Sequence, residues 1–189
     1  MGPKRNLPTA RVGLDPADRP LGGGGMTSYG MAMVEFTLNG RAVAVDAPPE
    51  EMLLDVLRGP LGLMGARFGC GAGQCGACAV LLDGRSVAAC RVEVGALGGK
   101  AVTTLEGLGT PQRPHPLQAA FLELQAGQCG YCLSGILVSA KALLDANPDP
   151  SRAEIADALD WHLCRCGVHN RVMDAVALAA KRLREGATA

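Results

Sequence analysis

Three cysteines, Cys70, Cys75 and Cys78, lie in one glycine-rich stretch, and Cys90 follows a short distance along the chain. The intervals of four and then two residues form the C-x4-C-x2-C…C pattern of plant-type [2Fe–2S] sites. Iron-bound thiolates in partly dry surroundings need backbone N–H donors. A loop that turns its amides inward needs positive φ angles, which glycine adopts at little cost. The spacing therefore predicts an iron–sulfur site at these four cysteines.

Zinc binding and disulfide bonding are the alternative uses of such a set. Structural zinc sites favour paired short C-x2–4-C knuckles, and this stretch holds a single pair of that kind. No secretory signal is visible, and a chain of 189 residues is long enough to fold without disulfide staples. Both alternatives are weaker than the iron–sulfur interpretation, and a zinc protein would be colourless.

The other four of the eight cysteines form two short pairs. Cys129 and Cys132 make the first pair, and Cys164 and Cys166 make the second. The segment between the pairs is long enough for two helices that run out and back, so all four sulfurs can meet at one end of a helical bundle. An even division of eight cysteines into four and four predicts a second [2Fe–2S] site.

Composition excludes several classes of protein. The chain has 18 basic and 18 acidic residues, and this balance argues against nucleic-acid binding, which leaves a basic footprint. Nothing resembles an apolar membrane span of about 20 residues.

Residues 1–31 are rich in proline and glycine without apolar periodicity, so we expect a flexible extension. They show neither an export signal nor a twin-arginine pair, and we expect a cytoplasmic protein.

The pattern of apolar residues and turns predicts an α+β fold with two domains. In residues 32–108, Asn39-Gly40 and Asp83-Gly84 mark tight hairpin turns, and a helix is expected to open at Pro48-Pro49 and to end at Gly59-Pro60. The order hairpin, helix, cysteine loop, hairpin and strand is that of a β-grasp, plant-type ferredoxin-like domain.

Residues 109–189 are expected to form four helices. The first is expected to open at His115-Pro116 and to end at Gly127, and the second to end at Asn147-Pro148. A capping box at Ser151 opens the third, and the fourth begins at about Asn170. Both cysteine pairs fall in the turns between helices, which predicts a four-helix [2Fe–2S]-binding domain.

Taken together, the motifs Cys-Gly-x-Gly-x-Cys-Gly-x-Cys, Gln-Cys-Gly-Tyr-Cys and Leu-Cys-Arg-Cys-Gly resemble the small iron–sulfur subunit of the xanthine oxidase family of molybdenum hydroxylases. The resemblance covers roughly residues 34–183 and includes Thr-Thr-Leu-Glu-Gly-Leu at 103–108. It is nearest to the nicotinate dehydrogenase, isoquinoline 1-oxidoreductase and aldehyde oxidoreductase type. In one place the chain departs from the family, because Trp161-His162 stand where a small residue and Asn are commoner.

The resemblance implies an electron-transfer subunit with no catalytic residue of its own. Two [2Fe–2S] clusters would carry electrons from a molybdopterin centre in a large partner subunit to a FAD subunit or a c-type cytochrome. The substrate would be an N-heteroaromatic compound or an aldehyde. The ferredoxin-like cluster lies nearer the acceptor in this family, and the helical-domain cluster lies nearer molybdenum. Gln128 and Cys166 map to positions that contact the pterin. A free-standing two-cluster ferredoxin is the alternative.

Overall fold

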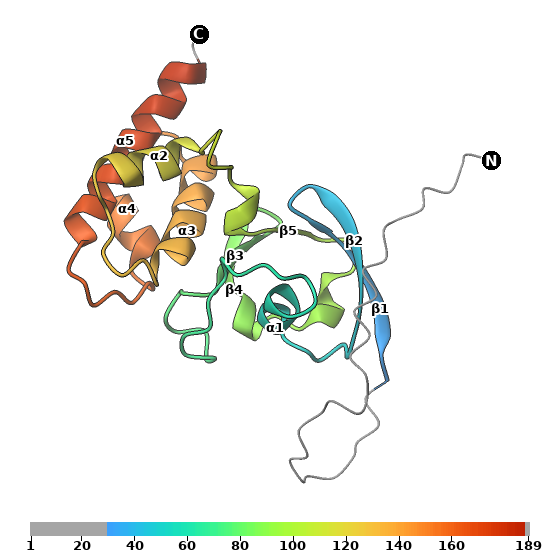
Figure 1. Cartoon of the computed structure of the whole chain (residues 1–189). Helices are drawn as coiled ribbons and strands as arrows, with labels where there is room; N and C mark the ends of the chain where they lie inside the picture. The colour runs from blue at the N-terminus through green and yellow to red at the C-terminus, as the bar shows by residue number, and fades with distance from the viewer. Residues whose placement is uncertain (1–29, 188–189) are drawn as a thin grey trace.

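The computed structural model describes residues 30–187, and the extension expected at residues 1–31 falls almost wholly outside them. Five strands and one short helix make an N-terminal unit, and α2 to α5 make a helical unit that packs beside it (Figure 1). The chain is α+β, with the ferredoxin-like unit first, as the sequence predicts. No helix among residues 30–187 is long and apolar enough to cross a membrane.

Two tight hairpins build the sheet. Strand β1 (Ala32–Leu38) pairs antiparallel with β2 (Arg41–Ala47), and Asn39 and Gly40 have positive φ angles of 50° and 77° at the turn. Strand β3 (Ala79–Leu82) pairs in the same way with β4 (Arg85–Ala88). Both turns are therefore of the kind that Asn-Gly and Asp-Gly predict.

Strand β5 (Ala101–Thr103) joins the two hairpins, giving the order β2-β1-β5-β3-β4. It lies parallel to β1 and antiparallel to β3. The mixed sheet is that of a β-grasp, and β5 is the element that fixes the first hairpin beside the strand that follows the cysteine loop.

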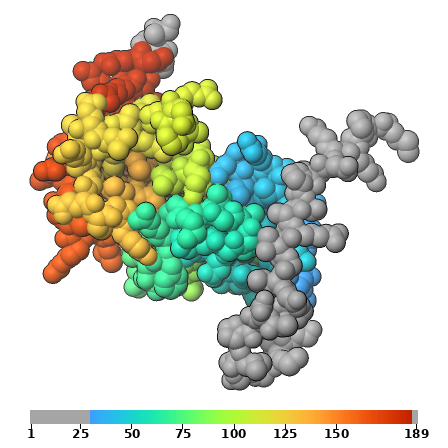
Figure 2. All heavy atoms as spheres, in the orientation of Figure 1, coloured from blue at the N-terminus to red at the C-terminus, as the bar shows by residue number. Residues whose placement is uncertain are grey.

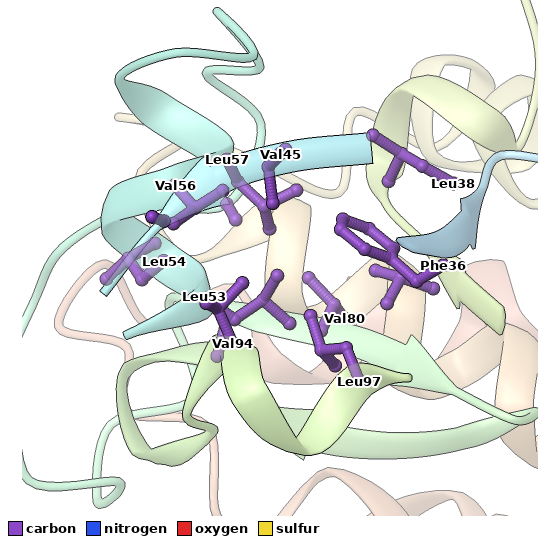
Figure 3. Close-up of a cluster of buried hydrophobic side chains, with 14 of the residues drawn as sticks. Phe36, Leu38, Val45, Leu53, Leu54, Val56, Leu57, Val80, Val94 and Leu97 are labelled. Atoms are coloured by element: carbon purple, nitrogen blue, oxygen red, sulfur yellow. The ribbon is translucent and has the colours of Figure 1, made fainter. Parts of the chain in front are cut away.

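Helix α1 (Leu53–Arg58) is shorter than the sequence indicated. The helix begins at Leu53 instead of Pro48, because Met52 is extended and bridges to Glu93. It ends at Gly59, as predicted. Its buried side chains meet those of the sheet and of the short 3-10 segment η3 (Val94–Leu97) in one apolar core (Figure 3).

The helical unit contains α2 (Pro116–Glu123), α3 (Leu133–Ala146), α4 (Arg152–Leu159) and α5 (His169–Ala187). His115 caps α2, and its ring Nδ1 accepts from the Leu117 N–H at 3.2 Å. The helix ends at Glu123, one turn before Gly127, where the sequence placed its end. The four helices bury a second apolar core of their own.

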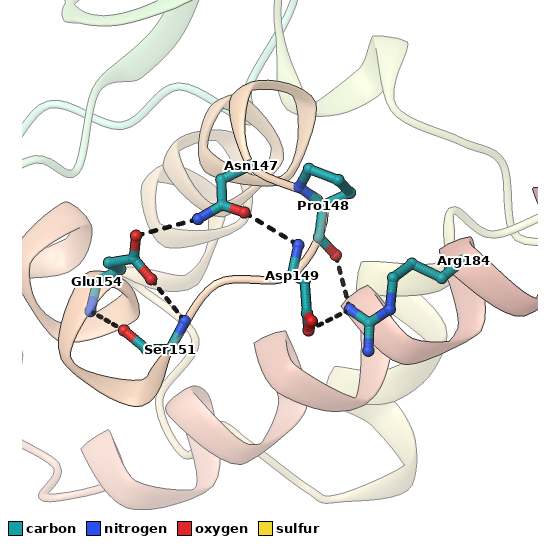
Figure 4. A network of polar contacts seen from close by, with 6 residues as sticks. All are labelled: Asn147, Pro148, Asp149, Ser151, Glu154 and Arg184. Atoms are coloured by element: carbon teal, nitrogen blue, oxygen red, sulfur yellow. Dashed lines mark hydrogen bonds and ion pairs between the residues drawn. The ribbon is translucent and has the colours of Figure 1, made fainter.

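A polar network fixes the turn between α3 and α4 (Figure 4). Ser151 and Glu154 form the predicted capping box, and the Glu154 carboxylate also accepts from the Asn147 amide at 3.1 Å. Arg184 of α5 donates to the Pro148 carbonyl at 2.7 Å. The network holds the end of α5 against this turn and so supports the relative placement of the helices that carry the cysteine turns.

The two units share an apolar interface. Ala79 and Leu81 on the outer face of β3 pack against Val138 of α3, with Trp161 at the edge. In the space-filling view, the green part of the N-terminal unit lies directly against the yellow part of the helical unit (Figure 2). The sheet is thus covered by α1 on one face and by α3 on the other.

Candidate iron–sulfur sites

The first cysteine set is assembled by the loop before β3 and the hairpin after it. Cys70 and Cys75 lie on the loop, and Cys78 directly precedes β3. The β3–β4 hairpin brings the chain back, and the Ala89 N–H donates to the Cys78 carbonyl at 3.2 Å. Cys90 follows in the short 3-10 segment η2 (Ala89–Arg91) and is buried beside Cys78. The hairpin therefore delivers the fourth thiol to the other three.

Glycines give this loop its curvature. Gly71, Gly73 and Gly76 all have positive φ angles between 66° and 74°. Gly69 is required for a different reason, because a Cβ at this position would lie 2.6 Å from the Cys75 sulfur. The loop therefore wraps closely around its own thiols, as a cradle for a thiolate-bound group requires.

The loop also stabilises negative charge on sulfur. The backbone N–H groups of Gln74 and Ala72 donate to the Cys70 Sγ at 3.2 and 3.3 Å, and they lower the pKa of that thiol to about 6. Burial raises the pKa of Cys78 to about 11. A buried thiol of this kind ionises when it binds a metal, which deprotonates a coordinating thiol outright.

The second set is assembled from two interhelical turns. Cys129 and Cys132 lie between α2 and α3, with Cys132 at the start of α3. Cys164 and Cys166 lie between α4 and α5. The Cys129 and Cys166 sulfurs are 3.6 Å apart. All four thiols line a cleft of about 230 Å³, and Cys75 of the first set lines its other wall.

The electrostatics of this set repeat those of the first. The backbone N–H of Tyr131 and the thiol of Cys166 lower the pKa of Cys129. Burial raises the pKa of Cys132 to about 12. Each set thus combines an exposed thiol whose pKa is lowered, chiefly by backbone N–H groups, with a buried thiol whose pKa is raised by burial.

The donor sets fit two-iron clusters. Each of these thiols interacts with others of its own set: Cys70 with Cys75, Cys78 with Cys90, Cys129 with Cys166, and Cys132 with Cys164. Contacts in pairs suit a cluster whose two irons each take two protein ligands, and none of the eight thiols forms a disulfide.

The two sites meet directly. The Leu163 N–H, beside Cys164, donates to the carbonyl oxygen of Cys75 at 3.1 Å. Nearby, a Cβ on Gly135 of α3 would lie 2.0 Å from the Gly76 carbonyl oxygen, and a Cβ on Gly76 would lie 2.1 Å from the His162 ring, so both positions require glycine. One ligand loop therefore rests on the other, with no intervening side chain at this point.

Arg67 makes a second bridge. Its guanidinium donates to the Gly130 carbonyl at 2.8 Å and lies 5.3 Å from the centre of the Tyr131 ring. The Tyr131 hydroxyl in turn donates to the carbonyl of Phe68. The contacts join the residues before Cys70 to the residues between Cys129 and Cys132. No local pattern in the sequence signals this bridge, because its partners are 63 residues apart.

His162 is a further residue whose place the sequence did not reveal. The ring is buried against Gly76, and its Nε2 lies 2.7 Å from the Ser139 hydroxyl. That hydroxyl contacts Ser86 of β4 at 2.6 Å. Burial lowers the pKa of His162 to about 4. A neutral histidine therefore links the second cysteine turn to the sheet.

Gln128 lies at the surface beside the exposed Cys129. It borders an apolar groove of about 770 Å³ whose walls include Phe121, Leu133 and Leu137. Cys166, the other residue assigned to the pterin, is on the same corner because its sulfur adjoins Cys129. The structure thus brings these two residues together where another protein could reach them.

Two family models match this architecture. The 2Fe-2S iron-sulfur cluster binding domain matches residues 36–100, and the [2Fe-2S] binding domain matches residues 104–177. The class of protein is therefore a two-domain, two-cluster iron–sulfur protein.

The comparison with whole proteins is more specific. The chain is 45% identical to a nicotinate dehydrogenase subunit from Pseudomonas putida, over 80% of this chain and 97% of that one. It is 47% identical to the alpha subunit of isoquinoline 1-oxidoreductase from Brevundimonas diminuta, over 79% and 98%. The crystal structure of aldehyde oxidoreductase from Desulfovibrio desulfuricans superposes with a TM-score of 0.80 at 45% identity, covering 82% of this chain and 17% of that one.

The chain belongs to the iron–sulfur subunits of the molybdenum hydroxylases, in the xanthine oxidase family. In the aldehyde oxidoreductase the equivalent unit is part of a much longer chain, whereas in the other two relatives it is a separate subunit. Members of this family serve as the electron-transfer component of an oxidoreductase, so the activity to which this chain contributes is that of a multi-subunit enzyme.

Proposed function

We propose that this chain connects a molybdopterin centre in a large partner subunit to an acceptor that is either a FAD subunit or a c-type cytochrome. Cys129, Cys132, Cys164 and Cys166 would hold one [2Fe–2S] cluster, and Cys70, Cys75, Cys78 and Cys90 the other. When bound, each cluster supplies storage for one electron at a potential that the surrounding protein sets. The division falls at residues 108 and 109, between a ferredoxin-like and a helical domain.

The hydrogen bond from Leu163 to Cys75 is the observation that carries the proposal. It joins a residue beside one cluster's ligand to a ligand of the other across a single peptide contact. The arrangement suits a relay, in which this chain's own residues fix the separation between two electron carriers. Against a free-standing ferredoxin stand Gln128 and Cys166, because they map to pterin-contacting positions and a free ferredoxin has no pterin to contact.

The direction of the relay is assigned from the family resemblance. Gln128 and Cys166 map to positions that contact the pterin in that family and lie at one corner of the helical unit, so we assign them to contact the pterin of the partner subunit. The ferredoxin-like cluster would then lie on the acceptor side. We also propose that the complex is cytoplasmic, where thiols stay reduced and available as cluster ligands.

The substrate belongs to the partner subunit. The relatives are named for nicotinate and isoquinoline, both N-heteroaromatic compounds, and the similar structure is named for an aldehyde. We propose an N-heteroaromatic substrate, because the relatives named for nicotinate and isoquinoline share this chemistry and are covered over nearly their full length.

The test is reduction by substrate in the co-purified complex. Nicotinate, isoquinoline and an aromatic aldehyde are added anaerobically, and bleaching of the cluster absorbance is followed by stopped flow. Rapid bleaching by an N-heteroaromatic compound supports the proposal. Clusters that dithionite reduces, but that no compound reduces in a molybdenum-containing complex, would contradict the substrate assignment. A chain that purifies alone with both clusters would favour the free ferredoxin.

Gln128 provides the variant for the pterin contact. Gln128→Ala should retain both clusters but weaken the magnetic coupling between molybdenum and the helical-domain cluster, with slower bleaching by substrate. Gln125→Ala is the matched control, because Gln125 borders the same groove but has no assigned contact. Unchanged coupling and unchanged bleaching in Gln128→Ala would argue against the contact.

A further inference from the structure

We propose that Arg67, which belongs to the ferredoxin-like unit, sets the reduction potential of the cluster in the helical unit. Its guanidinium would act through the Gly130–Tyr131 peptide on the sulfur of Cys129. The inference rests on the proposed ligand set and assigns Arg67 the role of a positioning residue. It does not make Arg67 a ligand.

The contacts form a continuous chain from charge to sulfur. Arg67 donates to the Gly130 carbonyl at 2.8 Å. The same peptide carries the Tyr131 N–H, and both this N–H and the charge of Arg67 lower the pKa of Cys129. Hydrogen bonds in series polarise one another, so a cation at the carbonyl end makes the N–H a stronger donor to the sulfur. Gly130 has a φ angle of 77°, a left-handed conformation that favours glycine between these two groups.

The side chain is held in this position. The Cζ atom of Arg67 lies over the Tyr131 ring, 5.3 Å from its centre and within the range of a cation–π contact. Tyr131 is fixed from the other side by its hydrogen bond to the Phe68 carbonyl. Arg67 is half-buried, so water screens its charge less than that of an exposed arginine.

The direction of the effect follows from charge. One-electron reduction of a cluster bound by four thiolates adds one negative charge, and no bond to the protein forms or breaks. A nearby cation and a stronger N–H···S bond both stabilise the reduced form, since cluster potentials respond to net charge and to hydrogen bonds on sulfur. Arg67 should therefore raise the potential of the helical-domain cluster and favour its reduction.

Arg165 offers a comparison within the chain. It lies between Cys164 and Cys166 and is exposed, and no hydrogen bond or ion pair is found for its guanidinium among the described residues. Both arginines carry the same charge near the same set of thiols. If the contact of Arg67 with the Gly130 peptide contributes more than its charge alone, neutralising Arg67 must shift the potential of the helical-domain cluster more than neutralising Arg165 does.

The experiment is a potentiometric titration of the iron-loaded full chain, in its complex, followed by low-temperature electron paramagnetic resonance. In Arg67→Gln we expect the equilibrium constant for reducing the helical-domain cluster to fall about tenfold, which is a shift of about 59 mV toward more negative potential. The ferredoxin-like cluster should shift less, and the iron content should remain that of the wild type. Arg165→Gln should shift the helical-domain cluster less than Arg67→Gln does.

Two further variants distinguish an effect of the Arg67 charge from an effect of the contacts that hold the two loops together. Tyr131→Phe removes the hydrogen bond to Phe68 but leaves the ring and the arginine, so its potentials should equal those of the wild type. Arg67→Met is a second neutral variant and decides the question if Arg67→Gln fails to assemble. An unchanged helical-domain potential in the neutral variants would overturn the proposal, and so would an equal shift in Tyr131→Phe. A wild-type chain that lacks one of the two signals would instead contradict the ligand sets.

Discussion

The backbone N–H of Leu163 donates to the carbonyl oxygen of Cys75 at 3.1 Å. Leu163 adjoins Cys164, so the contact joins the two cysteine sets through peptide groups alone. It depends on α3 approaching the first loop at Gly135, where any side chain would strike the Gly76 carbonyl. This packing has consequences that mutation can measure.

Gly135→Ala should destabilise the protein, although glycine-to-alanine changes inside helices ordinarily stabilise by about 1 kcal/mol. The new Cβ would lie 2.0 Å from the Gly76 carbonyl oxygen, and neither group can rotate away because the backbone fixes both positions. We expect the free energy of unfolding to fall by about 1–3 kcal/mol. Denaturant unfolding followed by circular dichroism measures the change.

Gly186→Ala in α5 is the control, since nothing lies within 4 Å of a Cβ at that position. It should be neutral or slightly stabilising. A Gly135→Ala protein as stable as this control would show that α3 and the first cysteine loop are not in the close contact described.

Ser139→Ala should cost about 1–3 kcal/mol of unfolding free energy, because it leaves the buried Nε2 of His162 without its hydrogen-bond partner. Ser134→Ala in the same helix is the matched control. Ser134 is equally buried, but its hydroxyl has no partner, so its loss should cost little. Equal losses of stability in the two variants would mean that the His162–Ser139 bond contributes nothing measurable.

His115 should make stability depend on pH. Burial lowers its pKa below the ordinary value of 6.5, with the charge of Lys141 as the next cause. The unfolded chain then binds a proton more readily than the native protein. The stability contribution is complete above pH 6.5 and is lost as pH falls through that value toward the lower native pKa. Protonation also removes the Nδ1 acceptor that caps α2.

His115→Asn keeps a capping side chain but does not titrate, so its melting temperature should fall less than that of the wild type between pH 7 and pH 5. His115→Ala should lose about 1 kcal/mol above pH 6.5, as expected for a lost N-cap, and its difference from the wild type should shrink as pH falls and the wild-type ring is protonated. Melting curves at a series of pH values test both. If the melting temperature of His115→Asn depended on pH as steeply as that of the wild type, other groups such as His162 would be responsible for the acid sensitivity.

Cys78→Ser should remove or weaken the ferredoxin-like cluster and leave the helical-domain cluster detectable. Cys132→Ser should do the reverse, since the two buried cysteines occupy equivalent places in separate sets. Iron analysis and electron paramagnetic resonance of each folded variant give the result. Loss of both signals in either variant would contradict the assignment of two independent sites.

Much of this architecture was predictable because turn and helix-capping residues, which lie close together in the sequence, determine it. Asn39-Gly40 favours a tight hairpin turn, because both residues adopt positive φ angles. Ser151 and Glu154 have the spacing of a capping box and cap α4. The start of α1 was predicted wrongly, because Met52 forms a bridge to Glu93 that no local pattern announces. Tertiary pairing decided that boundary over the helix-opening residues before it.

The cysteines themselves were predictable, since ligand spacing is a property of sequence. The contacts between the two sites were not. Arg67 and Gly130 are far apart in the chain, and the Ser86–Ser139–His162 chain of contacts draws on three separate elements. Such contacts depend on how the two units pack against each other. Apolar periodicity predicts that a face is buried but not which residues it meets.

The most direct test is electron paramagnetic resonance with metal analysis on the dithionite-reduced protein, isolated with whatever binds it. The predicted result is two distinct iron–sulfur signals, about four irons per chain and molybdenum in the co-purifying partner, because each of two [2Fe–2S] sites binds two irons. Iron without molybdenum or a partner would contradict the role in a molybdenum hydroxylase. Zinc in place of iron would contradict the interpretation of both cysteine sets.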